Sequence, residues 1–79
     1  MLIQIQYFAQ LRGLMGPDSI EVAEGTTVEG LLNSLFQKRP SLKVWNRHLL
    51  VAVGTEWAQR DYVIKPGDTI SLMPPVQGG

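Results

Sequence analysis

The sequence contains no cysteine. This absence excludes disulfide bonds, thiolate metal ligands and a cysteine nucleophile, and it suits a reducing compartment, so we expect a cytoplasmic protein. Neither charge is in excess, because seven Lys and Arg residues balance seven Asp and Glu residues. A neutral chain argues against binding to nucleic acid through phosphate contacts, and we expect no nucleic-acid partner.

Long apolar runs are also missing. No stretch approaches the roughly 20 apolar residues of a membrane-spanning helix. The first residues, Met1-Leu2-Ile3-Gln4, lack the basic region and apolar core of a signal peptide. We therefore expect neither a leader sequence nor a membrane partner.

Residues typical of active sites are few and scattered. His48 is the single histidine, and with no cysteine or carboxylate cluster near it we interpret it as structural or solvated. Asp61 and Asp68 form a conceivable acid–base pair, but both lie in turn-like stretches, where Asp is favoured for local hydrogen bonds. No phosphate-binding glycine loop is present. We expect no metal, no cofactor bound by this chain and no active site of its own.

One helix is strongly predicted within a chain of 79 residues, enough for one small domain. Thr26 and Glu29 fit a capping box. The residues after them place apolar side chains in one stripe over about three turns: Val28, Leu31, Leu32, Leu35 and Phe36. Lys38 and Arg39 suit the negative end of the helix dipole, and Pro40 ends the helix.

Strands are predicted on both sides of this helix. The first alternates over residues 2–8, with one face formed by Ile3, Ile5 and Tyr7. The others are predicted over residues 19–23, 49–53, 56–59 and 69–73. The nearly all-apolar strand at 49–53 suggests burial on both faces. The connections are expected to include a helical turn over 9–15, an irregular segment over 41–47 and a type II turn over 65–68.

This order of elements predicts an α+β fold of the β-grasp, or ubiquitin-like, type. One amphipathic helix can cover one face of a sheet, so we expect a mixed sheet of four to five strands with one main helix packed across one face. The open face would carry Met73, with Phe8 or Trp57 near it. An exposed apolar patch of this kind usually marks a partner surface.

The end of the sequence, Pro74-Pro75-Val76-Gln77-Gly78-Gly79, differs from the rest. The two prolines lack an N–H group, so the last strand must stop at Met73. We expect a domain over residues 1–73 and an extended tail over 74–79. Because glycine has no side chain, Gly78 and Gly79 can enter a channel too narrow for other residues. If the chain takes part in a reaction, we expect it at the carboxylate of Gly79.

The sequence resembles the small subunits of molybdopterin synthase, within the MoaD/ThiS group of ubiquitin-like sulfur carriers. The resemblance runs nearly end to end and is most specific in the Pro-Pro-Val-x-Gly-Gly ending, since the wider group shares only the final Gly-Gly. The other landmarks are residues 7–12, 27–32, 50–53 and 66–68. The prolines favour the molybdopterin branch over the thiamine branch. Two residues differ from the family pattern. Gly54 stands where family members commonly have Asn, and Met73 stands where they often have an aromatic residue.

The resemblance implies a reaction sequence. An adenylyltransferase resembling ubiquitin-activating enzymes would use MgATP to adenylate Gly79, and a sulfurtransferase system would convert it to a thiocarboxylate. The tail would then enter the large subunit of molybdopterin synthase, usually in a heterotetramer. Two sulfur transfers would turn cyclic pyranopterin monophosphate into the molybdopterin dithiolene.

The resemblance also assigns residues. Gly79 would bear the sulfur and Gly78 would give clearance in the channel. The partner surface would comprise Met73, Pro74, Pro75, Val76, Trp57, Phe8 and Arg12. Two alternatives share the same tail: sulfur delivery for thiamine or tRNA thiolation, and a ubiquitin-like binding or modifier domain that carries no sulfur.

Overall fold

The computed structural model describes residues 1–8, 11, 18–45 and 48–74. It contains a five-stranded sheet with the strand order β2-β1-β5-β3-β4. Strands β1 and β5 run parallel, and the other neighbouring pairs are antiparallel, so the sheet is mixed as predicted. The strands are β1 (Leu2–Tyr7), β2 (Asp18–Glu21), β3 (Leu50–Val53), β4 (Glu56–Trp57) and β5 (Thr69–Met73).

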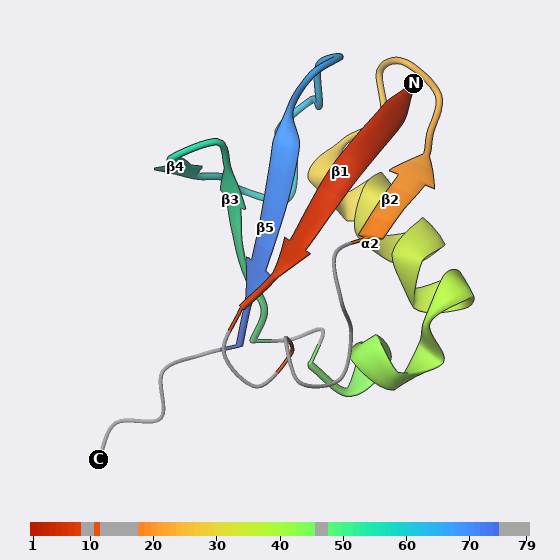
Figure 1. Ribbon diagram of the computed structural model, residues 1–79, viewed down its shortest axis with the longest axis vertical. Helices are drawn as coiled ribbons and strands as arrows, with labels where there is room; N and C mark the ends of the chain where they lie inside the picture. The colour runs from red at the N-terminus through yellow and green to blue at the C-terminus, as the bar shows by residue number, and fades with distance from the viewer. Residues whose placement is uncertain (9–10, 12–17, 46–47, 75–79) are drawn as a thin grey trace.

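Helix α2 (Val28–Lys38) packs across one face of this sheet (Figure 1). The predicted apolar stripe is confirmed, because all five of its side chains are buried. From the sheet, alternate residues of β1 and β5 meet this stripe: Ile3, Ile5, Tyr7, Ile70 and Leu72. The α+β, β-grasp prediction is therefore confirmed, with the core between the helix and one face of the sheet.

The start of α2 differs in detail from the predicted capping box. The cap is Thr27, whose Oγ1 accepts a hydrogen bond from the Gly30 N–H at 3.2 Å, whereas the Thr26 hydroxyl donates to the Ala23 carbonyl. Glu29 forms an ion pair with Arg60. The prediction failed because the loop before β5 supplies carbonyl acceptors for the N–H groups of Val28 and Glu29, which leaves the Glu29 side chain free to turn outward.

The C-terminal end of α2 is tied to β2 through Asp18. The Arg39 Nε donates to Asp18 Oδ2 at 2.7 Å, and the Lys38 Nζ donates to Asp18 Oδ1 at 3.2 Å. The Arg39 hydrogen bond is the main reason that the pKa of Asp18 lies well below its usual range. Burial, together with the adjacent negative charge of Asp18, raises the pKa of Tyr7 to about 12. These two cations thus bind a carboxylate on another element besides interacting with the helix dipole.

Several connections correct the predicted boundaries. The segment predicted to be irregular contains the 3₁₀ helix η1 (Pro40–Trp45), which buries Leu42. Strand β2 begins one residue earlier and ends two residues earlier than predicted, and β4 has two residues in place of four. The type II turn is confirmed: Gly67 has φ +90°, and the Asp68 N–H donates to the Lys65 carbonyl at 3.0 Å.

Strand β3 is not buried on both faces. Val51 and Ala52 are buried, but Leu50 is 40% exposed and Val53 is half-buried. The prediction was wrong because a continuous apolar run does not reveal how many layers cover a sheet, and here α2 covers one face. The uncovered face becomes the candidate site.

Candidate partner-binding surface

The strand register defines the side chains on the open face of the sheet. Leu50 lies opposite Met73, and Ala52 lies opposite both Ser71 and Trp57. Directly opposed residues of antiparallel strands point to the same side of a sheet. Ile70 and Leu72 of β5 point toward α2, so alternate residues along this strand, Met73 among them, point away from it.

Phe8 joins this face just beyond the end of β1. Its N–H donates to the Leu72 carbonyl at 3.0 Å, which continues the parallel ladder by one residue and brings Phe8 beside Met73. Both side chains are half-buried. We call the set Phe8, Leu50, Ala52, Trp57 and Met73 the apolar sheet surface. The sequence predicted Met73 on this face with Phe8 or Trp57 near it, and the register places both of these residues there.

The exposure of this surface suits contact with another protein. Trp57 is 68% exposed and Leu50 is 40% exposed, although both side chains are large and apolar. Ala52 and Ser71 lie between these residues, and both are small and buried. The larger side chains around them therefore project further from the sheet. An apolar patch on the uncovered side of a sheet is typical of a binding surface.

Sequence reasoning missed Leu50 as part of this surface. It lies in a run of apolar residues that suggested complete burial, and no local signal distinguishes it from Val51. The identification of Leu50 depends on its pairing with Met73 across β3 and β5. Pro74, which follows Met73, is buried and lies outside the strand, so β5 ends where the prolines predicted.

The charged residues considered for catalysis do not come together. Asp68 accepts hydrogen bonds from the Tyr62 hydroxyl at 3.0 Å and from the Lys65 N–H at 2.9 Å, as expected of a turn residue. The hydrogen bond to Asp68 is the main cause of the raised pKa of Tyr62. His48 and Asp61 are exposed. Within the described part of the chain, no group of three or more His, Cys, Asp or Glu residues could hold a metal ion.

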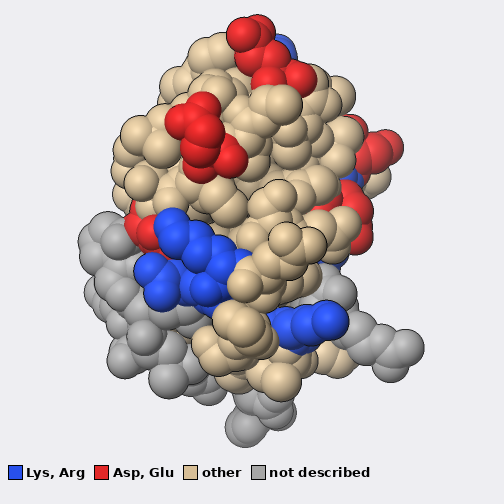
Figure 2. Space-filling model, turned by 90° about the vertical axis from the view of Figure 1, so that its right-hand side faces the viewer, with Lys and Arg blue, Asp and Glu red and all other residues tan. Residues whose placement is uncertain are grey.

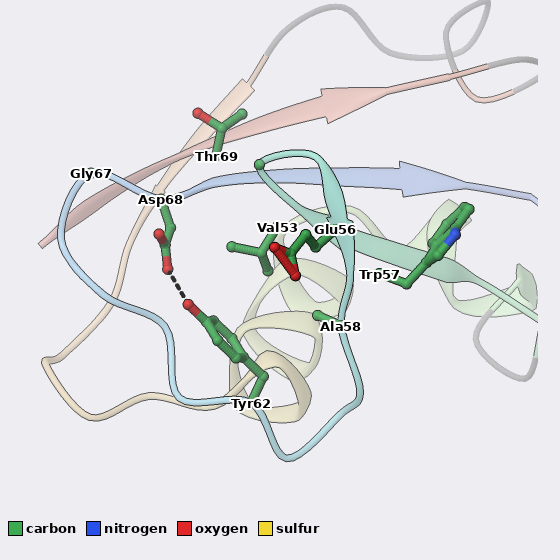
Figure 3. A pocket seen from close by; sticks show the side chains of 9 residues that line it. Val53, Glu56, Trp57, Ala58, Tyr62, Gly67, Asp68 and Thr69 are labelled. Atoms are coloured by element: carbon green, nitrogen blue, oxygen red, sulfur yellow. Dashed lines mark hydrogen bonds between the residues drawn. The ribbon is translucent and has the colours of Figure 1, made fainter.

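A shallow hollow of about 510 Å³ lies beneath the β3–β4 hairpin (Figure 3). Val53, Ala58 and Tyr62 contribute to its wall together with Glu56 and the hydrogen-bonded Asp68. Figure 3 shows that the Trp57 ring points away from these side chains, across β4. Trp57 thus lines an edge of the hollow and, through its pairing with Ala52, also belongs to the open face of the sheet. The residues that line the hollow include no nucleophile paired with a base.

The remaining predicted site residues lie outside the described part of the chain. They are Arg12, Pro75, Val76, Gly78 and Gly79. Their roles therefore stay predictions, and the described portion of the candidate site is the apolar sheet surface leading to Pro74.

Comparison with known proteins identifies the family. The chain matches the ThiS family over residues 5–79. The chain belongs to the ThiS family. Among relatives in this family, the molybdopterin synthase sulfur carrier subunit of Escherichia coli is 36% identical over 81 residues, covering 99% of this chain and 100% of that protein. The corresponding subunit of Haemophilus influenzae is 33% identical over the same coverage.

Solved structures agree with the ThiS-family assignment and with the β-grasp fold. The small archaeal modifier protein 1 (SAMP1) of Haloferax volcanii has a TM-score of 0.83 at 26% identity, with all of both chains covered. A chain in the complex of subunits 1 and 2 of the molybdopterin-converting factor of Helicobacter pylori has a TM-score of 0.74 at 25% identity, again with complete coverage. No described helix of this ThiS-family chain has the length and apolar character needed to span a membrane.

Proposed function

We propose that this protein is a sulfur carrier and the small subunit of molybdopterin synthase. The observation that carries the proposal is its similarity, over the full length, to sulfur carrier subunits of that enzyme. The apolar sheet surface adds physical support, because it lies beside the strand that leads directly into the Pro-Pro-Val-Gln-Gly-Gly segment. A partner bound to this surface is well placed to receive the residues that follow.

The reaction proceeds at the carboxylate of Gly79. In an activating enzyme that uses MgATP, this carboxylate attacks the α-phosphorus and displaces pyrophosphate, which gives an acyl adenylate. A sulfur nucleophile then attacks the acyl carbon and displaces AMP, leaving a thiocarboxylate. In the large subunit, the thiocarboxylate supplies sulfur to cyclic pyranopterin monophosphate, and two such transfers form the dithiolene.

This chain contributes recognition and a reactive end, while its partners contribute the catalytic groups. Trp57 and Leu50 provide apolar area for docking, and Met73 provides a flexible contact next to the tail. The same surface serves the activating enzyme and the large subunit in turn. Gly78 lets the chain pass a narrow channel toward either catalytic centre.

A second candidate function is that of a protein modifier, in which Gly79 forms an isopeptide bond with a lysine. The observation that favours it is the TM-score of 0.83 with the small archaeal modifier protein 1 of H. volcanii. Both functions begin with the same adenylate, so they differ in the group that displaces AMP. Sulfur delivery for thiamine or tRNA would also share the adenylate and would differ in the acceptor.

The test is the intact mass after incubation with an activating enzyme, MgATP and sodium sulfide. We expect a mass increase equal to the replacement of one oxygen by sulfur. A variant lacking Gly79 serves as the control and should keep its mass while remaining folded. An unchanged mass of the full chain, with an activating enzyme that is active on its own carrier, would contradict the sulfur-carrier proposal. Adding the E. coli large subunit and cyclic pyranopterin monophosphate then tests the acceptor.

A further inference from the structure

A second surface lies on the helical side of the molecule. A groove of about 550 Å³ crosses the C-terminal half of α2 and the start of η1, lined by Asn33, Phe36, Gln37, Pro40 and Lys43. Pro40 and Lys43 share one side of η1 because a 3₁₀ helix has three residues per turn. The neighbouring Val44 is 81% exposed. The groove thus combines apolar contacts, two side-chain amides and one ammonium group.

The charge around this groove is positive. Lys38, Arg39 and Lys43 lie at the end of α2 and in η1. Asp18 forms ion pairs with Lys38 and Arg39. Lys43 has no ion-pair partner within the described ranges, and no described residue lining the groove is acidic. Figure 2 shows Lys and Arg gathered in the lower half of this face, while most Asp and Glu lie in the upper half. The groove therefore complements an acidic ligand.

The position of the groove separates it from the apolar sheet surface. Helix α2 covers the opposite face of the sheet, so a protein on one surface leaves the other accessible (Figure 1). The C-terminal end of α2 and the end of β5 nevertheless lie at the same end of the molecule. A protein bound in the groove would therefore lie at the same end of the molecule as Pro74, which follows β5.

We propose that this groove docks an acidic segment of a persulfide-bearing donor protein, while the activating enzyme occupies the apolar sheet surface. The terminal sulfur of the persulfide attacks the acyl carbon of the Gly79 adenylate and displaces AMP, which links donor and carrier through an acyl disulfide. A second thiol of the donor then attacks the donor's own sulfur in that bond, so that a disulfide forms on the donor and the thiocarboxylate of Gly79 is released. The inference rests on the proposed function. An acyl adenylate must stay shielded in the activating enzyme until sulfur arrives, so the donor needs a surface that this enzyme leaves open. Carboxylates of the donor segment pair with Lys43, and an apolar side chain packs against Phe36 and Pro40.

The test compares two charge reversals. Lys43→Glu places a negative charge at the groove, and Lys65→Glu makes the same change in net charge at an exposed turn whose hydrogen bond to Asp68 uses the Lys65 backbone. Each carrier variant is first bound to the activating enzyme. Biolayer interferometry then measures the Kd between this complex and a sulfurtransferase that carries a persulfide. We expect Lys43→Glu to raise the Kd about tenfold at low salt, and less at high salt, because one attraction becomes a repulsion. Lys65→Glu should change it less than about twofold.

Three results would overturn the inference. The first is that Lys43→Glu and Lys65→Glu weaken sulfurtransferase binding equally. The second is that the sulfurtransferase does not bind the wild-type carrier while the activating enzyme holds it. The third is that Met73→Asp abolishes binding of the sulfurtransferase to the free carrier. Sulfide-driven thiocarboxylate formation is measured in parallel. Normal sulfur uptake from sulfide by Lys43→Glu shows that the variant folds and is activated. If the wild type takes up no sulfur from sulfide, the proposed function fails; if it does and donor binding ignores Lys43, only the docking proposal fails.

Discussion

Replacing Asp18 by Asn tests the polar link between β2 and the end of α2. The carboxylate is 10% exposed, and it receives hydrogen bonds from Arg39, Lys38 and the Ser19 N–H, the last at 2.8 Å. Asn keeps the shape of the side chain but loses its charge. Both carboxylate oxygens of Asp18 accept hydrogen bonds. In Asn the NH₂ group replaces one of these oxygens, so this donor points at the donor of a neighbouring group.

The expected loss of stability follows from these contacts. A hydrogen bond to a charged group contributes about 1.5–3 kcal/mol. The Arg39 and Lys38 side chains are partly exposed and regain water when the carboxylate is removed, which limits the penalty. We therefore expect Asp18→Asn to lower the free energy of unfolding by about 2 kcal/mol at pH 7. Urea titration followed by circular dichroism measures this difference.

The effect should depend on pH in a defined direction. The pKa of Asp18 is lower in the folded protein, chiefly because of the Arg39 hydrogen bond, so the folded state favours the charged carboxylate. Stabilisation from such a group is complete above the pKa of the unfolded state, about 3.9, and is lost as the pH falls toward the folded pKa. The advantage of the wild type over Asp18→Asn should be full at pH 7, decline below about pH 5 and still be falling at pH 2, because the folded pKa of Asp18 is strongly lowered.

A matched control separates this link from a general charge effect. Asp61→Asn removes the same charge at an exposed position and should change the free energy of unfolding by less than about 0.5 kcal/mol. Equal effects of the two substitutions at pH 7 would refute the reasoning. So would a difference between wild type and Asp18→Asn that remained constant from pH 7 to pH 2.

Three further predictions test the core, the sheet surface and the tail. Leu32→Ala should lower the free energy of unfolding by about 2–5 kcal/mol in urea titration, because Leu32 is fully buried; a loss below 1 kcal/mol would contradict its place in the core. Met73→Asp should abolish detectable large-subunit binding in calorimetry at a stability cost of about 1 kcal/mol or less, and a loss as large as that of Leu32→Ala would mark Met73 as core. Gly78→Ala should fold normally and slow thiocarboxylate formation, and a wild-type rate by intact mass would mean that the channel accepts a methyl group.

The elements were predicted well where one physical cause dominates. The spacing of five apolar side chains could arise from no other regular structure than an amphipathic helix, and the Lys65–Asp68 turn needed a glycine with positive φ at one position. Predictions failed where distant residues supply alternatives. Thr26 and Thr27 are equally good caps locally, and the choice between them depends on carbonyls from the loop before β5.

The candidate site divides along the same line. Met73 could be selected from the sequence because the alternation of the last strand turns it away from the inward-facing Ile70 and Leu72. Trp57 was selected chiefly from the family resemblance, and it is exposed. Leu50 could not be selected, since its neighbours are equally apolar and its exposure follows from pairing with Met73. The groove on α2 was also beyond sequence reasoning, because Phe36 lies in α2 and Lys43 lies in η1, and the packing of these two elements brings them together.

The sequence by itself determined the β-grasp fold, the helix that covers the sheet, the end of the last strand at Met73 and the family to which the tail belongs. Local periodicity, proline geometry and a short specific ending suffice for these features. The tertiary structure decided which apolar residues face solvent, which threonine caps α2 and which cations Asp18 binds. These features depend on contacts between residues far apart in the chain, and their free energies exist only once the sheet and the helix have packed together.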